Sequence, residues 1–146
     1  MLRYLNIRNL AVIESLEVTL QPGLNVMTGE TGAGKSIVVG AVGLLLGDRA
    51  SADVVRTGEE IAIIQAVFDH AGREVIVRRE VNAQGRSRSF VDGTLVTAAA
   101  LKELGIEDRT IVIFASDNGP EKTGAERQKE LRGGYGTFYS VGTTGG

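Results

Sequence analysis

The sequence contains no cysteine, which excludes disulfide bonds, thiolate catalysis and cysteine metal sites. Its single histidine, His70, lies in a predicted turn, where we expect a solvated side chain. The net charge of −2 provides no general attraction to nucleic acids or anionic membranes. The longest apolar run, residues 37–46, is interrupted by glycine and is too short to cross a bilayer. Residues 1–6 lack the apolar core of a signal peptide, so we expect a cytoplasmic protein with no membrane partner.

Length and composition predict one folded domain with a glycine-rich end. The chain has 146 residues, of which 42% are hydrophobic and 23% are charged, so a packed core is expected. Eight of its 20 glycines lie in residues 119–146. That tail has few apolar side chains, and we expect it to be largely loop.

A complete phosphate-loop motif, G-x-x-x-x-G-K-[ST], is the most informative feature of the chain. An apolar run at residues 24–27 precedes the motif and predicts a buried strand, while residues 37–46 predict a helix after it. Glycines would let the backbone turn so that its N–H groups converge on phosphate oxygens. Lys35 would reach the β- and γ-phosphates of ATP, and the Ser36 hydroxyl would ligate Mg²⁺. The predicted nucleotide-binding residues are Gly29, Glu30, Thr31, Gly32, Ala33, Gly34, Lys35 and Ser36.

The remaining pattern predicts an antiparallel set of strands with a short helix after it. Strands are expected at residues 2–7, 12–20, 61–68, 74–81 and 88–91. A hairpin turn is expected at residues 69–73 and another turn at Asp92-Gly93. Gly47 is suited to end the helix of residues 37–46, which is apolar on nearly all sides and needs extensive cover. Thr97 is suited to cap a helix that runs to Leu104.

Several polar residues have two interpretations. Five arginines in the hairpin region could contact DNA, but interspersed glutamates favour a solvated strand face. Asp48 and Arg49 could face a nucleotide or a partner, or simply form a polar turn. Residues 111–117 could be a Walker B strand, although two residues separate the apolar run from its aspartate. The five arginines are Arg73, Arg78, Arg79, Arg86 and Arg88.

Residues 1 to about 104 resemble the N-terminal head segment of RecN-type DNA repair ATPases, which are related to SMC (structural maintenance of chromosomes) proteins. The matching stretches are residues 5–13, 23–36, 44–50 and 86–91. The resemblance implies an α/β, ABC-type half-domain, in which a parallel-type core strand and the phosphate-loop helix lie beside an antiparallel β lobe. It also implies ATP and Mg²⁺ as cofactors, and a second head or the C-terminal half of a RecN-like protein as partner. DNA contact is then possible through the parent complex.

Residues from about 101 to 139 resemble a C-terminal fragment of a sulfatase. The similarity includes Asp117-Asn118 and the stretch 131–137. In that family the Asp-Asn pair ligates calcium, which implies a Ca²⁺ site at Asp117 and Asn118. The family's sulfate-binding lysine is replaced here by Tyr135, and neither Pro22 nor Pro120 follows a Cys or Ser at the spacing of the nucleophile motif.

The two resemblances predict a chimera, with a RecN-like segment at residues 1–104 and a sulfatase-like fragment, largely loop, at residues 105–146. The leading hypothesis is an ATP-binding head fragment of a protein for DNA double-strand break repair and recombination. The alternatives are a sulfatase remnant that binds calcium and a chimera without function. The RecN-like family is an ATPase, but its Walker B and signature motifs lie in a C-terminal half that this sequence does not match. We therefore expect no catalytic residue and no ATP turnover by this chain alone.

Overall fold

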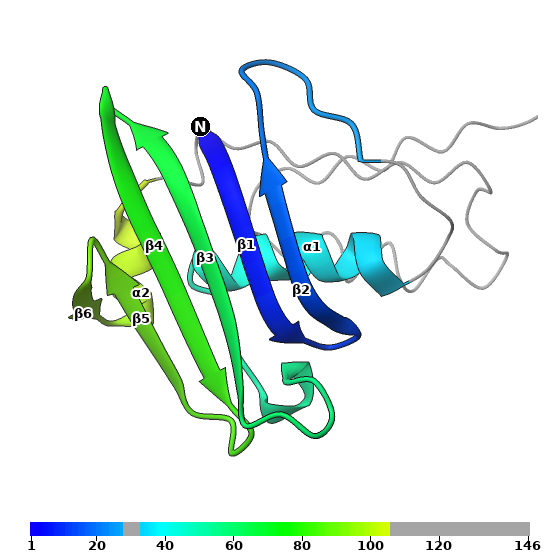
Figure 1. Cartoon of the computed structure of the whole chain (residues 1–146). Coiled ribbons are helices and arrows are strands. Elements are labelled where there is room, and N and C mark those ends of the chain that lie inside the picture. The colour runs from blue at the N-terminus through cyan, green and yellow to red at the C-terminus, as the bar shows by residue number, and fades with distance from the viewer. Residues whose placement is uncertain (28–32, 106–146) are drawn as a thin grey trace, which may run out of the picture. The chain divides into compact units, whose positions relative to one another are not determined.

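Six strands form one antiparallel sheet in the order β2-β1-β3-β4-β5-β6, as the computed structural model shows (Figure 1). The structure describes residues 1–27 and 33–105. The strands are β1 (Leu2–Leu10), β2 (Ile13–Thr19), β3 (Ile61–His70), β4 (Arg73–Asn82), β5 (Ser87–Val91) and β6 (Thr94–Val96). Three further elements are α1 (Ala33–Leu45), the 3₁₀ turn η1 (Ala52–Val54) and α2 (Ala98–Glu103).

The predicted hairpins are confirmed, and their strands are slightly longer than the sequence pattern indicated. Strands β3 and β4 pair from His70–Arg73 at the turn to Ile61–Asn82 at the far end. Their two-residue turn is Ala71-Gly72, with positive φ at both residues, as the twist of a tight hairpin requires. Strand β1 pairs with β2 on one side and β3 on the other, so the N-terminal strand lies inside the sheet.

Both helices lie on one face of the sheet (Figure 1). Alternation along the strands directs apolar side chains of β1, β3 and β4 to this inner face. One stripe of α1, spaced at i, i+3, i+4 and i+7, is buried against β3 and β4. The helix was predicted to need cover on nearly all sides; outside the stripe Leu44 is also buried, while Ile37 and Val39 are only half-buried. The buried stripe consists of Val38, Ala41, Val42 and Leu45.

The short helix α2 confirms its predicted cap. The Thr97 hydroxyl oxygen accepts a hydrogen bond from the Ala100 N–H at 3.1 Å, which satisfies one of the unpaired donors of the first turn. Strand β6 was not predicted, since three residues are too few to give a periodic pattern. It pairs with β5 across the Asp92-Gly93 turn, where both residues have positive φ.

The predicted buried strand before the phosphate loop is wrong for this structure. Residues 24–27 have no strand assignment, and the side chains of Leu24 and Val26 are 86% and 73% exposed. A strand requires a neighbour for its backbone N–H and C=O groups. Among the described residues, no strand lies beside this segment, and every strand pairing of the sheet is antiparallel. The parallel-type core strand is therefore not formed within residues 1–27 and 33–105.

Candidate functional site

The first turn of α1 contains the second half of the phosphate-loop motif, from Ala33 to Ser36. Ser36 is exposed and Lys35 is half-buried. No acidic residue lies in this first turn, so no carboxylate there neutralises the positive end of the helix dipole. The other predicted nucleotide-binding residues, Gly29, Glu30, Thr31 and Gly32, lie outside the described residues.

Gly34 has a helical backbone conformation. It lies in the helix and is not among the residues with positive φ, so no tight turn requires a glycine here. A Cβ atom at this position would meet no heavy atom of the described chain within 4 Å. The open space beside Gly34 leaves the backbone of the first turn accessible to a ligand.

The C-terminal end of α1 is closed by a Schellman motif, which confirms the predicted role of Gly47. The Asp48 N–H donates to the Gly43 carbonyl at 3.0 Å, and the Gly47 N–H donates to the Leu44 carbonyl at 3.2 Å. Gly47 has φ +104°, which favours glycine, and a Cβ there would lie 2.8 Å from the Ala98 carbonyl oxygen of α2. The end of α1 is thus fixed closely against α2. The Asp48 side chain turns back over Gly43, so a larger residue at that position would have to displace the Asp48 carboxylate.

Arg79 of β4 is buried beneath this end of α1, with 2% of its surface exposed. Its Nη1 donates to the Leu44 carbonyl at 2.8 Å, and its Nη2 donates to the Ser87 hydroxyl at 3.1 Å. Its Nε has no hydrogen-bond partner within the described part of the chain. Burial lowers the pKa of the Arg79 guanidinium, and the negative charge of Asp48 opposes that shift. Sequence analysis grouped Arg79 with surface arginines, which is wrong because its place in the alternating pattern of β4 directs it inward.

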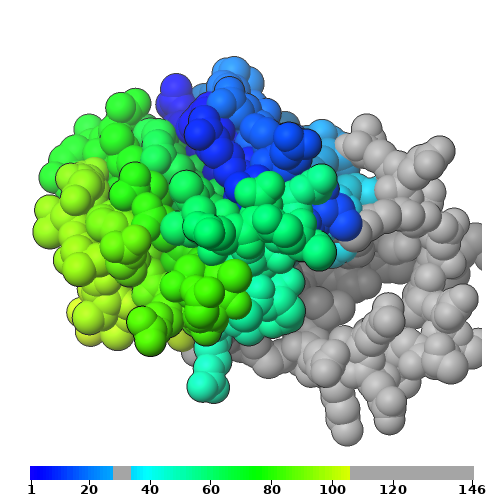
Figure 2. All heavy atoms as spheres, turned by 60° about the horizontal axis from the view of Figure 1, so that its bottom comes forward, coloured from blue at the N-terminus to red at the C-terminus, as the bar shows by residue number. Residues whose placement is uncertain are grey.

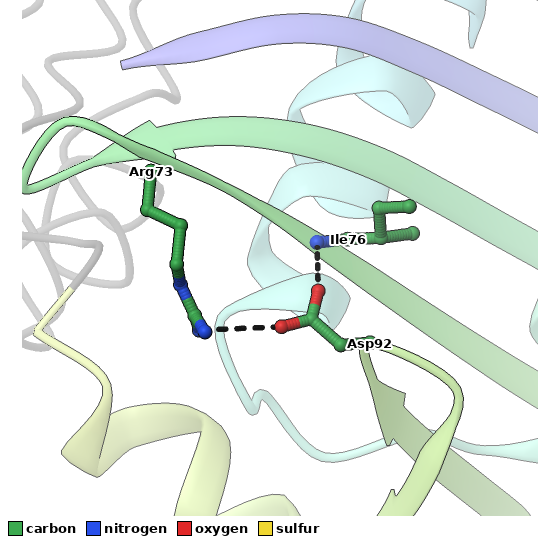
Figure 3. Close-up of polar contacts among 3 residues, drawn as sticks. All are labelled: Arg73, Ile76 and Asp92. Carbon is green, nitrogen blue, oxygen red and sulfur yellow. Dashed lines mark hydrogen bonds and ion pairs between the residues drawn. The ribbon is translucent and has the colours of Figure 1, made fainter.

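The other arginines of this region do not form an unopposed basic surface. Arg78 lies over the Phe90 ring at 4.5 Å from its centroid, and both Arg78 and Arg88 pair with Glu80 at 3.2 Å. Arg73 pairs with Asp92 at 3.2 Å, and the second Asp92 carboxylate oxygen accepts the Ile76 N–H (Figure 3). These contacts favour the interpretation of a solvated strand face with interspersed acidic residues.

Residues 51–56 lie against the turn between β1 and β2 at one end of the sheet, and Figure 2 views the molecule from that side. The Arg56 guanidinium donates to the Val12 carbonyl at 2.8 Å, and the Ala11 N–H donates to the Val54 carbonyl. A surface hollow of about 390 Å³ lies near the turn between β4 and β5. Its mixed charge does not indicate a phosphate site. The lining residues are Ile61, Glu80, Asn82, Arg86, Ser87 and Arg88.

The structure says less about the other features predicted from the sequence. Asp48 and Arg49 follow α1 at its C-terminal end, the end opposite Lys35 and Ser36, so the polar-turn interpretation fits Asp48. Residues 1–27 and 33–105 contain no group of three or more His, Asp or Glu side chains that could hold a metal ion. No helix in those ranges is long and apolar enough to cross a membrane. The calcium pair Asp117 and Asn118, the alternative Walker B strand and the glycine-rich tail lie outside them.

Comparison with known proteins points to one group. The AAA domain family matches residues 4–133. The DNA repair protein RecN of Bacillus subtilis (strain 168) is 40% identical over 122 residues, covering 72% of this chain and 21% of that protein. RecN of Halalkalibacterium halodurans is 43% identical over 122 residues, with 72% and 22% covered.

Solved structures share the fold. The SMC head domain from Thermotoga maritima has a TM-score of 0.66 at 19% identity, covering 78% of this chain and 47% of that one. The recombination mediator RecF bound to ATP has a TM-score of 0.63 at 16% identity, covering 89% and 36%.

This chain spans about a fifth of the length of the RecN proteins that it matches. The boundary near residue 104 and the sulfatase-like fragment after it stay predictions. The fold of the described residues is that of an SMC- and RecF-type ATPase head. The chain therefore belongs to the AAA domain family, and its N-terminal segment matches RecN.

Proposed function

We propose that this chain is the N-terminal part of a RecN-like DNA repair ATPase head and binds Mg-ATP through residues 29–36. The observation that carries the proposal is the position of Gly34, Lys35 and Ser36 in the first turn of α1, which itself contains no acidic residue. Lys35 would neutralise charge on the β- and γ-phosphates, and the Ser36 hydroxyl would ligate Mg²⁺. The names of the RecN relatives support the assignment to DNA repair, and a role in recombination is part of the same proposal. A cytoplasmic location is part of the same proposal.

The exposed apolar side chains of residues 24–27 favour the presence of a binding partner that covers them. Leu24, Val26 and Met27 are apolar and exposed, directly before the phosphate loop. Burial of such side chains is favourable, and their backbone, which has no strand beside it among the described residues, could accept a neighbouring strand. We propose that the C-terminal half of a RecN-like protein, or a second head, supplies this neighbour and forms the parallel-type core strand.

Nucleotide turnover and DNA contact would then depend on that partner. A bound nucleotide needs a general base and a positioned water, and the sequence provides neither Walker B nor signature motif. The ion pairs of Arg73, Arg78 and Arg88 reduce the positive charge available on this segment for DNA. Binding of DNA would therefore belong to the complete complex.

Calorimetry with the wild-type chain and Lys35→Ala tests the proposal. Loss of a charge-assisted contact to phosphate should weaken Mg-ATP binding by roughly 10-fold or more. Arg3→Ala is a control, since it also removes one positive charge, and its exposed side chain lies on β1 and not on α1. Equal affinity of wild type and Lys35→Ala would contradict the proposal, as would an equal loss in Arg3→Ala.

A further inference from the structure

Apolar packing by itself does not fix where α1 lies along the sheet. The helix packs on β3 and β4, whose buried residues include the aliphatic Ile64 and Val77, and apolar contacts are non-directional. A helix on this surface could slide or rotate by a fraction of an ångström at little cost in buried area. Fixing its position requires contacts that depend on direction.

Arg79 provides such a contact at the C-terminal end. It donates to the Leu44 carbonyl at 2.8 Å, while the Ser87 hydroxyl of β5 holds the other side of the guanidinium at 3.1 Å. The planar group therefore connects the helix to two strands with defined geometry. Its positive charge also lies where the helix dipole is negative, and α1 has no basic residue of its own in its last turn.

Close contacts on the other side leave the end of α1 little room to move. Gly47 lies against the Ala98 carbonyl, and Asp48 turns back over Gly43. The helix is a stiff rod of 13 residues, so a displacement of one end moves the other. Lys35 and Ser36 are on the first turn of this rod, and small errors in the position of binding groups reduce their contribution strongly.

We infer that Arg79 is a positioning residue for the nucleotide site: it fixes the C-terminal end of α1 on β4 and β5 and thereby sets where Lys35 and Ser36 meet the phosphates. The inference rests on the proposed binding of Mg-ATP at residues 29–36. Arg79 itself touches no phosphate, since it lies at the opposite end of the helix.

Three variants test the inference by calorimetry with Mg-ATP, each corrected for its folded fraction from a urea curve. Arg79→Met fills similar space without charge or donor and should weaken binding about 10-fold. Arg79→Lys keeps the charge and one possible donor, and should weaken binding about 3-fold. Val77→Ala is the matched control, because Val77 is fully buried on the same face of β4 as Arg79. Its truncation lowers stability but leaves the hydrogen bonds of Arg79 in place.

The outcomes separate this inference from the proposed function. Absence of Mg-ATP binding by the wild type would overturn both. Binding by the wild type with unchanged affinity in folded Arg79→Met would overturn only the role of Arg79, and so would an equal loss in Val77→Ala. If Arg79→Met does not fold, Arg79→Lys provides the test. Weaker Mg-ATP binding by Arg79→Lys than by Val77→Ala supports the inference, and wild-type affinity of Arg79→Lys overturns it.

Discussion

Strand β3 and residues 24–27 have similar apolar sequences but opposite surroundings. Four side chains of β3 are buried, including Ile64 and Phe68, whereas Leu24 and Val26 are 86% and 73% exposed. The difference is in their neighbours: β3 has β1 and β4 on its two sides, and residues 24–27 have no strand beside them in the described part of the chain. An apolar run thus indicates that burial would be favourable, while the pairing partner decides whether a strand forms.

The largest effect is expected from Phe68→Ala. Phe68 of β3 is fully buried, and truncation of such a side chain costs about 3–5 kcal/mol of unfolding free energy. Urea denaturation followed by circular dichroism measures the loss. Leu95→Ala is the control, since Leu95 is 61% exposed and should cost little. Similar losses in both variants would show that β3 is not the core of the sheet.

Asp92→Ala should have the next largest effect, by about 1–2 kcal/mol. The Asp92 carboxylate accepts the Ile76 N–H at 2.8 Å, and its backbone has φ +48°, which alanine tolerates poorly. Asp92→Asn keeps an acceptor and tolerates positive φ, so it should recover most of the loss in the same urea experiment. The exposed ion pair to Arg73 contributes little by comparison. An equal loss of unfolding free energy in Asp92→Asn and Asp92→Ala would instead assign the effect to the negative charge of Asp92.

Ala71→Gly should stabilise the β3–β4 hairpin, by about 0.5–1 kcal/mol. Ala71 has φ +52°, a conformation that costs an alanine free energy and a glycine almost none. Thermal unfolding should show a higher midpoint temperature. Ala83→Gly is the comparison, because Ala83 lies in another turn without positive φ and should be destabilised slightly. A lower midpoint for Ala71→Gly would mean that the turn has a different geometry.

Val26→Thr should have the smallest effect, within about 0.5 kcal/mol, because its side chain is already largely in water. The same change at fully buried Val77 should cost about 1–3 kcal/mol of unfolding free energy, since the added hydroxyl would be buried without its hydrogen bonds to water. The two variants compare the regions directly in one urea experiment. A large loss in Val26→Thr would show that residues 24–27 are buried in solution.

Local sequence was sufficient to predict the hairpins, the C-terminal end of α1 and the cap of α2, whereas α1 begins at Ala33, four residues before the predicted start. Turn residues such as Gly47, Gly72 and Gly93 have the positive φ that their positions require, and Thr97 forms its expected cap. These features depend on a few neighbouring residues, which is why a single sequence reveals them.

Features that depend on distant residues were missed. Residues 24–27 have a strand-like composition, but composition does not report whether a neighbouring strand exists. The inward position of Arg79 had a signal in the sequence. Arg79 lies at the same every-second-residue spacing as Val75, Val77 and Val81, which are all buried on one face of β4. Its contact with Leu44 joins residues 35 positions apart and could not be read from either segment alone.

The strand order has a consequence for self-association. The sheet has two edges in the described structure, β2 and β6. Strand β2 carries Glu14 and Glu17, whose charges oppose pairing with another chain, and β6 has only three residues. Residues 24–27 carry no charge, and three of the four, Leu24, Val26 and Met27, are apolar. Aggregation of this chain in the absence of a partner should therefore begin at Leu24 and Val26 and leave the edges of the sheet intact.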